Sequence, residues 1–493
     1  MNSFVQSEIR EFYERVKLQE PEIKNPFRHR LHLSWIKKIE VALCFVFIFP
    51  IRLCAALVVF TLIIFVSNVI IFGRDPSDVR IPLSPWRRKL KGLLRFLVRS
   101  LFFVMGFHYV RVKGKLASPQ EAPICVYAPH SSFLDVLLAS VLDEVPSGLS
   151  KAENFRNPFL GALFMASESI GVSRDSAKSR LQSVEEVKYR TVVTRGQWPH
   201  LGVCPEGTCT NRKALITFKA GAFIPGCPVQ PILFKYPGTP DVYTWVNDGP
   251  SGFQLLMFIM CQLHHPAEVE FLPVWQPNNE EMENPKLFAE NVQNSMAKAL
   301  GISTTGHSFE DVLLMKEGSN LGLPDDAAVV EFQKVSSKLG MNLDYMKARL
   351  GMFVAIDTNR DGLITLTDFA RHYRLPISSA LKQMFSALDP DNKGHVTFRQ
   401  YLIGTACLAN IGSSKTMAQD ALTVLQRCGK SISVLSSLVD QQTVQGLLQS
   451  MDDMFRDEFN VRSRNEEMQA FFNCHPEFVV LITLMTLQVK RES

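Results

Sequence analysis

The 493-residue sequence lacks several patterns that would place it in a common class of protein. Its ten cysteines form no Cys-x-x-Cys pair and no spacing typical of a metal site, which favours reduced thiols over a secreted disulfide framework. It contains no Asn-x-Ser/Thr sequon, and we expect no cleavable signal peptide because the first forty residues are charged and the apolar run starts late. These absences predict a folded part that faces the cytosol.

The chain also has little net charge and lacks the Gly-x-Ser-x-Gly motif of serine hydrolases. The formal charge is only +5, and the basic excess lies near the apolar segments, so a membrane surface explains it better than nucleic acid. The interleaving of aromatic and basic residues that is typical of a nucleic-acid module is missing, and we expect no nucleic-acid partner. Without a Gly-x-Ser-x-Gly motif, a hydrolase with a covalent serine is a weaker interpretation.

The most informative pattern is a histidine followed five residues later by an aspartate, His130 and Asp135, after a short apolar run at 124–127. Histidine titrates near neutral pH, so His130 is a candidate general base, and a carboxylate on its far nitrogen would fix the tautomer and favour the imidazolium. Two groups at this spacing do not share a face of one helix. We therefore expect His130 in a strand-to-helix loop, with Ser131 or Ser132 capping the helix that carries Asp135.

A second pattern supports a catalytic role for the first, which alone would occur by chance in many chains. The apolar run at 201–204 ends in a turn with the sequence Glu-Gly-Thr-Cys, where glycine lets a phosphate-bearing ligand approach the backbone. Two arginines add cations that can hold a phosphate through paired hydrogen bonds. The predicted substrate-binding residues are Arg174, Glu206, Gly207, Thr208, Cys209 and Arg212.

Taken in order, these motifs resemble the glycerolipid acyltransferases with the HXXXXD motif. The resemblance covers roughly residues 90–275, with family blocks at 130–135, 171–174, 206–208 and 224–231. It implies that the histidine deprotonates an acceptor hydroxyl, which attacks the thioester of acyl-CoA, the co-substrate, while the aspartate supports the histidine.

One departure from the family pattern narrows the resemblance. Most members have arginine directly after Glu-Gly-Thr, whereas this chain has Cys209, with Arg212 three residues on. This form is similar to the lysophosphatidylcholine acyltransferase branch. It implies transfer of an acyl or acetyl group to lysophosphatidylcholine or its alkyl-ether analogue, at the endoplasmic reticulum membrane, with the Golgi and lipid droplets as alternatives.

An apolar segment at 41–72 predicts membrane association. Residues 53–72 carry no charge and are long enough to cross a bilayer core of about 30 Å, although a buried core helix is an alternative. Basic residues flank both sides, so charge gives no orientation, and a hairpin around Pro50 and Arg52 competes with a span. Residues 86–109 alternate basic and apolar side chains, as in a helix among lipid head groups or on a protein surface.

A third pattern, at 357–368, is that of an EF-hand calcium loop, with glycine at its sixth position. Aspartate at position 12 is one methylene shorter than the usual glutamate, which favours modest affinity and also suits Mg²⁺. The predicted ligands are Asp357, Asn359, Asp361, Leu363, Thr365 and Asp368.

The loop at 389–400 is its expected partner. Lys393 at position 5 and Gln400 at position 12 make this second loop structural, and its doubtful ligands are Asp389, Asp391 and His395. We expect Ile364 and Val396 to pair between the two loops.

The predicted fold is an α/β acyltransferase domain on an N-terminal membrane-embedded helical segment, followed by an all-α EF-hand domain. The alternative function is a calcium-responsive membrane adaptor with an inactive acyltransferase fold; the oligomeric state stays open. The predicted parts are a charged cytosolic arm (1–40), membrane-associated helices (41–110), the acyltransferase domain (111–300), a linker (301–325), the EF-hand pair (326–412) and a helical region of unknown role (413–493).

Overall fold

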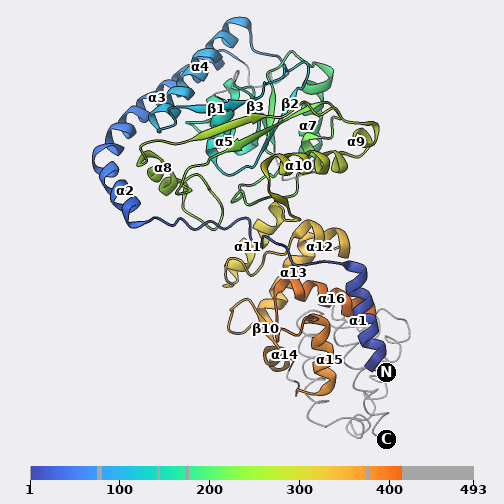
Figure 1. Ribbon diagram of the computed structural model, residues 1–493. Helices are drawn as coiled ribbons and strands as arrows, with labels where there is room; N and C mark the ends of the chain where they lie inside the picture. The colour runs from blue at the N-terminus through green and yellow to red at the C-terminus, as the bar shows by residue number, and fades with distance from the viewer. Residues whose placement is uncertain are drawn as a thin grey trace, which may run out of the picture. The chain divides into compact units, whose positions relative to one another are not determined.

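The computed structural model describes residues 2–74, 80–140, 145–172, 177–373, 375 and 377–412. Arg174 and the predicted region 413–493 lie outside these residues. The chain forms two compact units, which are coloured by residue number in Figure 1. The sheet unit is Asn25–Phe309, and the helical unit joins Met1–Lys24 to the chain from Glu310 onward.

The sheet unit is built on seven strands in the order β1-β8-β7-β2-β5-β3-β4. All neighbours are parallel except β7 and β8, which run antiparallel. The strands are β1 (Val110–Lys113), β2 (Ile124–Ala128), β3 (Ser147–Lys151), β4 (Ile170–Val172), β5 (Leu201–Val203), β7 (Val229–Lys235) and β8 (Ala267–Phe271). A separate parallel pair joins β6 (Ala214–Leu215) to β9 (Ser303–Thr304).

Strand β2 lies in the middle of the sheet, and all five of its residues are buried. Successive residues of a strand point to opposite faces, so both faces of the sheet are covered here. Ile124 and Val126 pack in one apolar cluster with Phe288 of α10 (Pro285–Leu300). Tyr127 packs in a second cluster with Leu134 of α5 (Phe133–Ala139). The sheet is therefore a layer between helices, as expected for an α/β domain. Its shorter helices are α6 (Gly161–Ala166), α7 (Ala177–Lys188), α8 (Gly252–Met260) and α9 (Asn279–Glu283).

The apolar segment forms α2 (Trp35–Phe47) and α3 (Phe49–Ile71), which follow one another along one side of the sheet unit (Figure 1). Among the described residues, α3 is the one helix long and apolar enough to cross a membrane. Pro50 lies in its first turn, where the missing N–H costs no helical hydrogen bond. Arg52 donates hydrogen bonds to the carbonyl groups of Met260, Gln262 and Leu263, at the carboxyl end of α8 and just beyond it. The arginine that interrupts the apolar run is thus paired inside the sheet unit.

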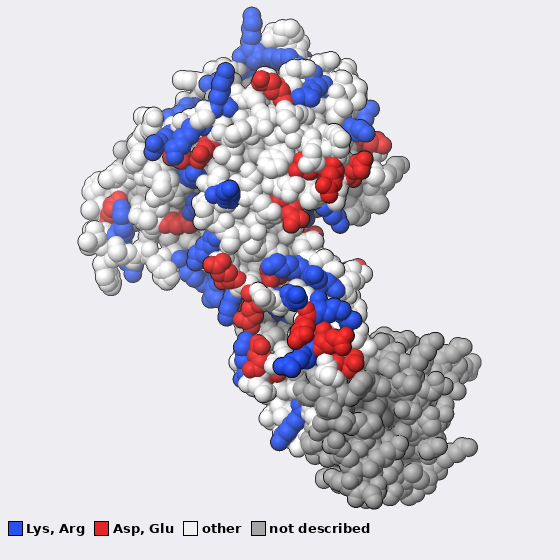
Figure 2. Space-filling model, turned by 45° about the vertical axis from the view of Figure 1, so that its right-hand side comes forward, with Lys and Arg blue, Asp and Glu red and all other residues white. Residues whose placement is uncertain are grey.

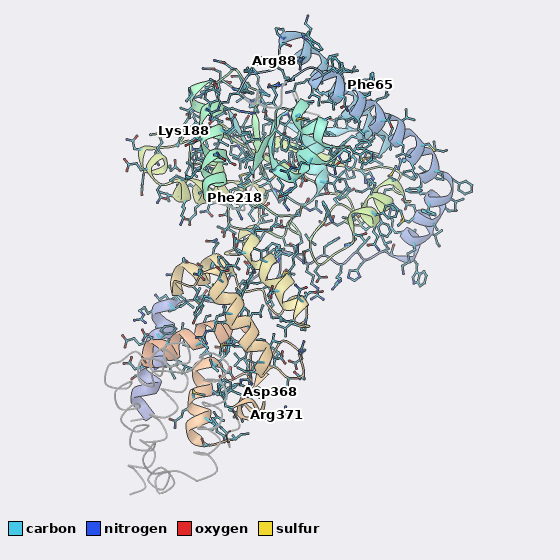
Figure 3. All side chains as sticks on the ribbon, turned by 180° about the vertical axis from the view of Figure 1, so that it is seen from behind. Phe65, Arg88, Lys188, Phe218, Asp368 and Arg371 are labelled. Carbon is cyan, nitrogen blue, oxygen red and sulfur yellow. The ribbon has the colours of Figure 1, made fainter. Side chains whose placement is uncertain are left out.

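Helix α4 (Pro85–Val104) has two different sides. Leu94 and Val98 pack against Ile63 and Ile70 of α3 in one apolar cluster. Phe96 and other large apolar side chains of the same helix are exposed. On α3, Phe65 marks the outward side in Figure 3 and is 65% exposed. The face in Figure 2 shows basic side chains scattered among uncharged surface on this unit.

The helical unit contains α1 (Asn2–Val16), α11 (Phe309–Asn320, whose first residue closes the sheet unit), α12 (Phe332–Leu339), α13 (Leu343–Ile356), α14 (Leu366–His372), α15 (Ser379–Leu388) and α16 (Phe398–Gly412). Two short strands, β10 (Ile364–Thr365) and β11 (His395–Val396), pair antiparallel. The predicted partners Ile364 and Val396 face each other in this register. The predicted arm at 1–40 contains α1, whose Ile9, Phe12 and Val16 are buried in the core of this unit.

Candidate active site

Three neighbouring parallel strands end where the candidate active site begins. Strand β2 lies between β7 and β5, and all three point the same way. The residues just beyond their carboxyl ends include His130, Glu206 and Tyr236. Open α/β sheets bind ligands in the crevice outside the carboxyl ends of their strands.

His130 and Asp135 form the predicted pair. His130 Nδ1 lies 3.0 Å from Asp135 Oδ2, and the same oxygen accepts hydrogen bonds from the amides of Ser131 and Ser132 at 2.7 and 2.9 Å. The Ser132 hydroxyl in turn accepts from the Leu134 amide and caps α5. The strand-to-helix loop and the serine cap are therefore confirmed.

The second oxygen of the aspartate has a partner that the sequence did not reveal. Tyr236, the first residue after β7, donates its hydroxyl hydrogen to Asp135 Oδ1 over 2.7 Å. Burial and the adjacent carboxylate raise the pKa of Tyr236 well above its usual value, so the phenol stays protonated and acts as the donor.

Glu206 is fully buried beneath the histidine loop. Its Oε2 accepts from the backbone amide of His130 at 2.5 Å, and its Oε1 accepts from the amide of Ile216 at 3.3 Å. Burial raises the pKa of Glu206 to about 7, although the hydrogen bond from the His130 amide opposes this. In this arrangement the carboxyl group holds two loops together, and a contact with substrate stays a prediction.

The turn after Glu206 closes over the other side of the imidazole. Gly207 has a φ of +69°, which favours glycine. The amide of Thr210 donates to the His130 carbonyl at 2.8 Å, and Cys209 Sγ lies 3.6 Å from His130 Nε2. Thr208 and Cys209 are partly exposed. The nitrogen that would take a proton therefore faces the Glu-Gly-Thr-Cys turn, a contact that the sequence did not predict.

The surroundings of His130 act on its pKa in both directions. Burial lowers it, whereas the nearby Cys204 and Cys209 sulfur atoms and the bond to Asp135 raise it by more, and the net pKa lies well above the usual value. A base with this shift holds a proton firmly once it has accepted one.

Arg212 forms an ion pair with a carboxylate of the protein, that of Asp241. Its Nη2 lies 2.6 Å from Asp241 Oδ2, and its guanidinium stands over the rings of Tyr236 and Tyr243 at 5.5 and 6.0 Å. Burial raises the pKa of Asp241, but Arg212 and the Thr244 hydroxyl lower it by more. A phosphate contact by Arg212, as the sequence suggests, would have to compete with this ion pair.

A strap from the start of the sheet unit holds the same turn. The Asn211 amide donates to the Pro26 carbonyl at 2.8 Å, and its side-chain amide donates to the carbonyls of Asn25 and Arg28. Phe27 between them is fully buried. No motif signals this contact, because it joins residues almost two hundred positions apart.

Comparison with known proteins agrees with this geometry. The Acyltransferase family profile matches residues 109–235, which span β2, the His130 loop and the Glu206 turn. Human lysophosphatidylcholine acyltransferase 2 is 42% identical over 404 residues, covering 81% of this chain and 73% of that protein. The mouse protein of the same name is 39% identical over 477 residues (94% and 85%), and rat lysophosphatidylcholine acyltransferase 1 is 39% identical over 399 residues (81% and 74%). The chain belongs to the lysophosphatidylcholine acyltransferase family.

A solved structure, the 1-acyl-sn-glycerophosphate acyltransferase of Thermotoga maritima, matches 54% of this chain and 97% of its own at 18% identity. The TM-score of 0.35 is too low to define the fold. Membership of the acyltransferase family rests on the sequence relatives, and it makes an inactive adaptor the less favoured alternative.

In this acyltransferase the first predicted calcium loop contains a buried carboxylate oxygen that accepts no hydrogen bond from the protein. Asp357 Oδ2 accepts from the Gly362 amide at 2.9 Å, while its buried Oδ1 has no protein partner. Burial is the main cause of a raised pKa at Asp357. Gly362 has a φ of +83°, as the sharp turn requires. An orphaned carboxylate oxygen of this kind fits a bound cation.

The other predicted ligands of the first loop bind each other. Asn359 Nδ2 donates to Asp361 Oδ2 at 2.9 Å, and the Leu363 amide donates to Asp361 Oδ1. Asp368 Oδ2 accepts from the amide and hydroxyl of Thr365 and so caps α14; its Oδ1 lies 3.5 Å from Arg371, its neighbour in Figure 3. Across the described residues, no three His, Cys, Asp or Glu side chains gather as a metal cluster.

The second loop is held by its own side chains. Asp389 accepts from the amides of Lys393 and Gly394, one on each oxygen. Lys393 Nζ lies 3.0 Å from Asp391 and 3.0 Å from Glu20. The lysine ammonium takes up the charge of Asp391, and His395 lies in β11 opposite Thr365. A structural role for this loop stays a prediction.

Proposed function

We propose that this enzyme transfers an acyl group from acyl-CoA to the free hydroxyl of a choline lysophospholipid, either lysophosphatidylcholine or its alkyl-ether analogue. The observation that carries the proposal is the His130–Asp135 pair, with its second imidazole nitrogen facing the Glu-Gly-Thr-Cys turn. The choline head group is supported by the names of the three relatives described above, which are lysophosphatidylcholine acyltransferases.

The chemistry follows from the pair. The acceptor hydroxyl gives its proton to His130 Nε2 as its oxygen attacks the thioester carbonyl, and Asp135 stabilises the imidazolium that forms. The carbon–sulfur bond to CoA then breaks, and the imidazolium returns the proton to the departing thiolate. An ester and free CoA are the products, and the histidine is restored.

Membrane association is the second part of the proposal. Helices α2 and α3 expose large apolar side chains such as Trp35, Phe47 and Phe65, and a lysophospholipid resides in a bilayer because its chain avoids water. We place the enzyme at the endoplasmic reticulum membrane, with the catalytic face toward the cytosol. The described cysteines form no disulfide bonds, which supports the cytosolic orientation.

Calcium binding is the third part. The first loop would hold Ca²⁺ through Asp357, Asn359, Asp361, Leu363, Thr365 and Asp368, with Mg²⁺ as an alternative. When bound, the ion supplies charge neutralisation that orders the loop. The orphaned Asp357 oxygen supports this site, and the second loop is proposed to be structural.

The test is thiol release from acyl-CoA by the purified full-length enzyme in vesicles. The acceptors are lysophosphatidylcholine, its alkyl-ether analogue, lysophosphatidylethanolamine and lysophosphatidic acid, each with Ca²⁺ and with chelator. We expect acceptor-dependent release that is fastest with the choline lipids. A preference for lysophosphatidic acid would contradict the head-group assignment.

A variant assigns the base. His130→Ala is expected to lower turnover by about 10³-fold, within the range of lost general-base catalysis, and to leave vesicle binding unchanged. Appreciable residual turnover would remove His130 from the role of base.

A further inference from the structure

The catalytic aspartate uses its two oxygens for different tasks. Asp135 Oδ2 is taken by His130 Nδ1 and by two backbone amides, all within 3.0 Å. Asp135 Oδ1 accepts a hydrogen bond from the Tyr236 hydroxyl at 2.7 Å. This distance is shorter than the 3.0 Å between Asp135 Oδ2 and His130 Nδ1. Asp135 is almost fully buried, so water cannot easily replace a lost donor there.

Tyr236 is itself held rigidly. Its ring stacks on Tyr243 at a centroid distance of 5.1 Å and meets the edge of Phe107. The Arg212 guanidinium, fixed by Asp241, stands over the Tyr236 ring. Because the backbone leaves β7 directly before this residue, a rigid strand aims the hydroxyl at Asp135.

We propose that Tyr236 is a positioning residue for acyl transfer, whose hydroxyl fixes the Asp135 carboxylate and limits how strongly that carboxylate holds the proton of His130. The proposal rests on the general-base mechanism described above. Tyr236 acts through Asp135 and is not assigned a contact with substrate.

The direction of the effect follows from charge sharing. A phenol that donates to Oδ1 draws negative charge away from the histidine side of the carboxylate. Without that donor, more of the charge faces His130, and the imidazolium becomes harder to deprotonate. The variant should therefore need a higher pH to populate the free base.

The test compares two tyrosines that differ in one contact. Tyr236→Phe removes the hydroxyl and keeps the ring. Tyr243→Phe is the matched control, because that hydroxyl also lies in the core but binds His265 Nδ1 at 2.9 Å instead of Asp135. For each protein we would measure kcat, KM for both substrates, the pH profile of kcat/KM and the thermal unfolding midpoint.

For Tyr236→Phe we expect kcat to fall by about tenfold, the effect of losing one hydrogen bond to a charged group. Both KM values should stay within about twofold, and the acid limb of kcat/KM should move to higher pH. Tyr243→Phe should leave that limb in place. Equal losses in both variants with an unmoved acid limb would show a packing role only and would overturn the proposal.

A second readout does not depend on turnover. The rate of His130 modification by diethyl pyrocarbonate, taken against the matching His130→Ala background, reports the free imidazole as a function of pH. Its midpoint should rise in Tyr236→Phe, and an unchanged midpoint would overturn the proposal. If the unaltered enzyme showed no acyl transfer but the modification midpoint still rose in Tyr236→Phe, the proposed function would be rejected and the positioning role of Tyr236 would stand.

Discussion

At the scale of single residues, the protonation of His130 sets the pH range of the enzyme. Its pKa is raised, with the sulfur atoms of Cys204 and Cys209 and the bond to Asp135 outweighing burial. The acid limb of kcat/KM should therefore have its midpoint above pH 6.5, with the rate rising as the base loses its proton. Rates measured at substrate concentrations well below KM across a range of pH give this midpoint, and a midpoint below pH 6.5 would contradict the expectation.

The raised pKa of His130 changes stability with pH in the opposite direction to activity. A raised pKa means that folded His130 binds its proton more tightly than the unfolded chain does. Its contribution to the free energy of unfolding is fully present below the unfolded pKa and is lost as pH rises through the folded pKa. Activity and this part of stability thus change in opposite directions over one pH interval.

Glu206 gives a second prediction at this scale. Glu206→Gln would place an amide N–H₂ against the backbone amide of either His130 or Ile216, since each carboxylate oxygen accepts one of them. We expect the free energy of unfolding to fall by about 1–3 kcal/mol, the cost of one unsatisfied buried donor, and kcat to fall because the His130 loop shifts. Denaturant unfolding and turnover check this, and a variant with unaltered kcat would separate the carboxylate from catalysis.

Residue types at fixed spacing were enough to predict part of the site. His130, Asp135 and the Ser132 cap are local to one loop, so the sequence order carries their geometry. Tyr236 and Asp241 were not predicted, because they reach the site from the end of another strand. For the same reason Arg212 was predicted to hold a phosphate, while its carboxylate partner could not be seen in the sequence. The position just after a third buried parallel strand was the one available signal for Tyr236.

At the scale of elements, the sequence predicts strands at 124–127, 201–204, 229–234 and 269–272, which correspond to β2, β5, β7 and β8. The first three are buried on both faces, whereas β8 alternates buried and half-buried residues. β2 is an apolar run and β5 is apolar apart from a glycine, whereas β7 is buried along its length except at its last residue, although it contains Gln230; burial on both faces is what strands in the middle of a covered sheet require. β3 has the polar sequence Ser-Gly-Leu-Ser-Lys and was missed, as were β1 and β4. The predicted linker at 301–325 contains helix α11, because tertiary packing of Val312, Leu314 and Met315 overrides its glycine-rich composition.

Helix α3 gives a prediction about the membrane. Phe65 is exposed on its outward side (Figure 3), so Phe65→Ser should weaken binding to vesicles by roughly tenfold, the equivalent of about 1.5 kcal/mol for an apolar side chain kept out of water. Met282→Ser on α9 is the control, since that side chain is exposed at a different element. Vesicle flotation and thermal unfolding measure both, and equal binding by the two variants would remove α3 from the membrane contact.

At the scale of the whole molecule, calcium should act on the helical unit through one loop. Asp357→Asn and Asp389→Asn are compared because each removes one charge from its loop and keeps an acceptor for the loop glycine. Asp389→Asn also sets its amide against the Lys393 backbone amide, so the readout is the response to Ca²⁺ and not the basal stability. We expect Ca²⁺ to raise the unfolding midpoint of the unaltered enzyme, with about 2.7 kcal/mol of stabilisation at one hundred times Kd. Asp357→Asn should lose this response and Asp389→Asn should keep it. Calorimetric titration checks the site directly, and loss of binding in Asp389→Asn would assign the ion to the second loop.

The order of the chain through the two units has a consequence for biosynthesis. Helix α1 belongs to the helical unit, yet the whole sheet unit of Asn25–Phe309 lies between it and the rest of that unit. At about 5–20 residues per second, the ribosome needs roughly 15–60 s to make the intervening chain. During that time Ile9, Phe12 and Val16 have no completed core to enter. The first helix to be synthesised is therefore among the last to find its partners, and the nascent enzyme has to be kept from aggregating until residues beyond 400 have emerged.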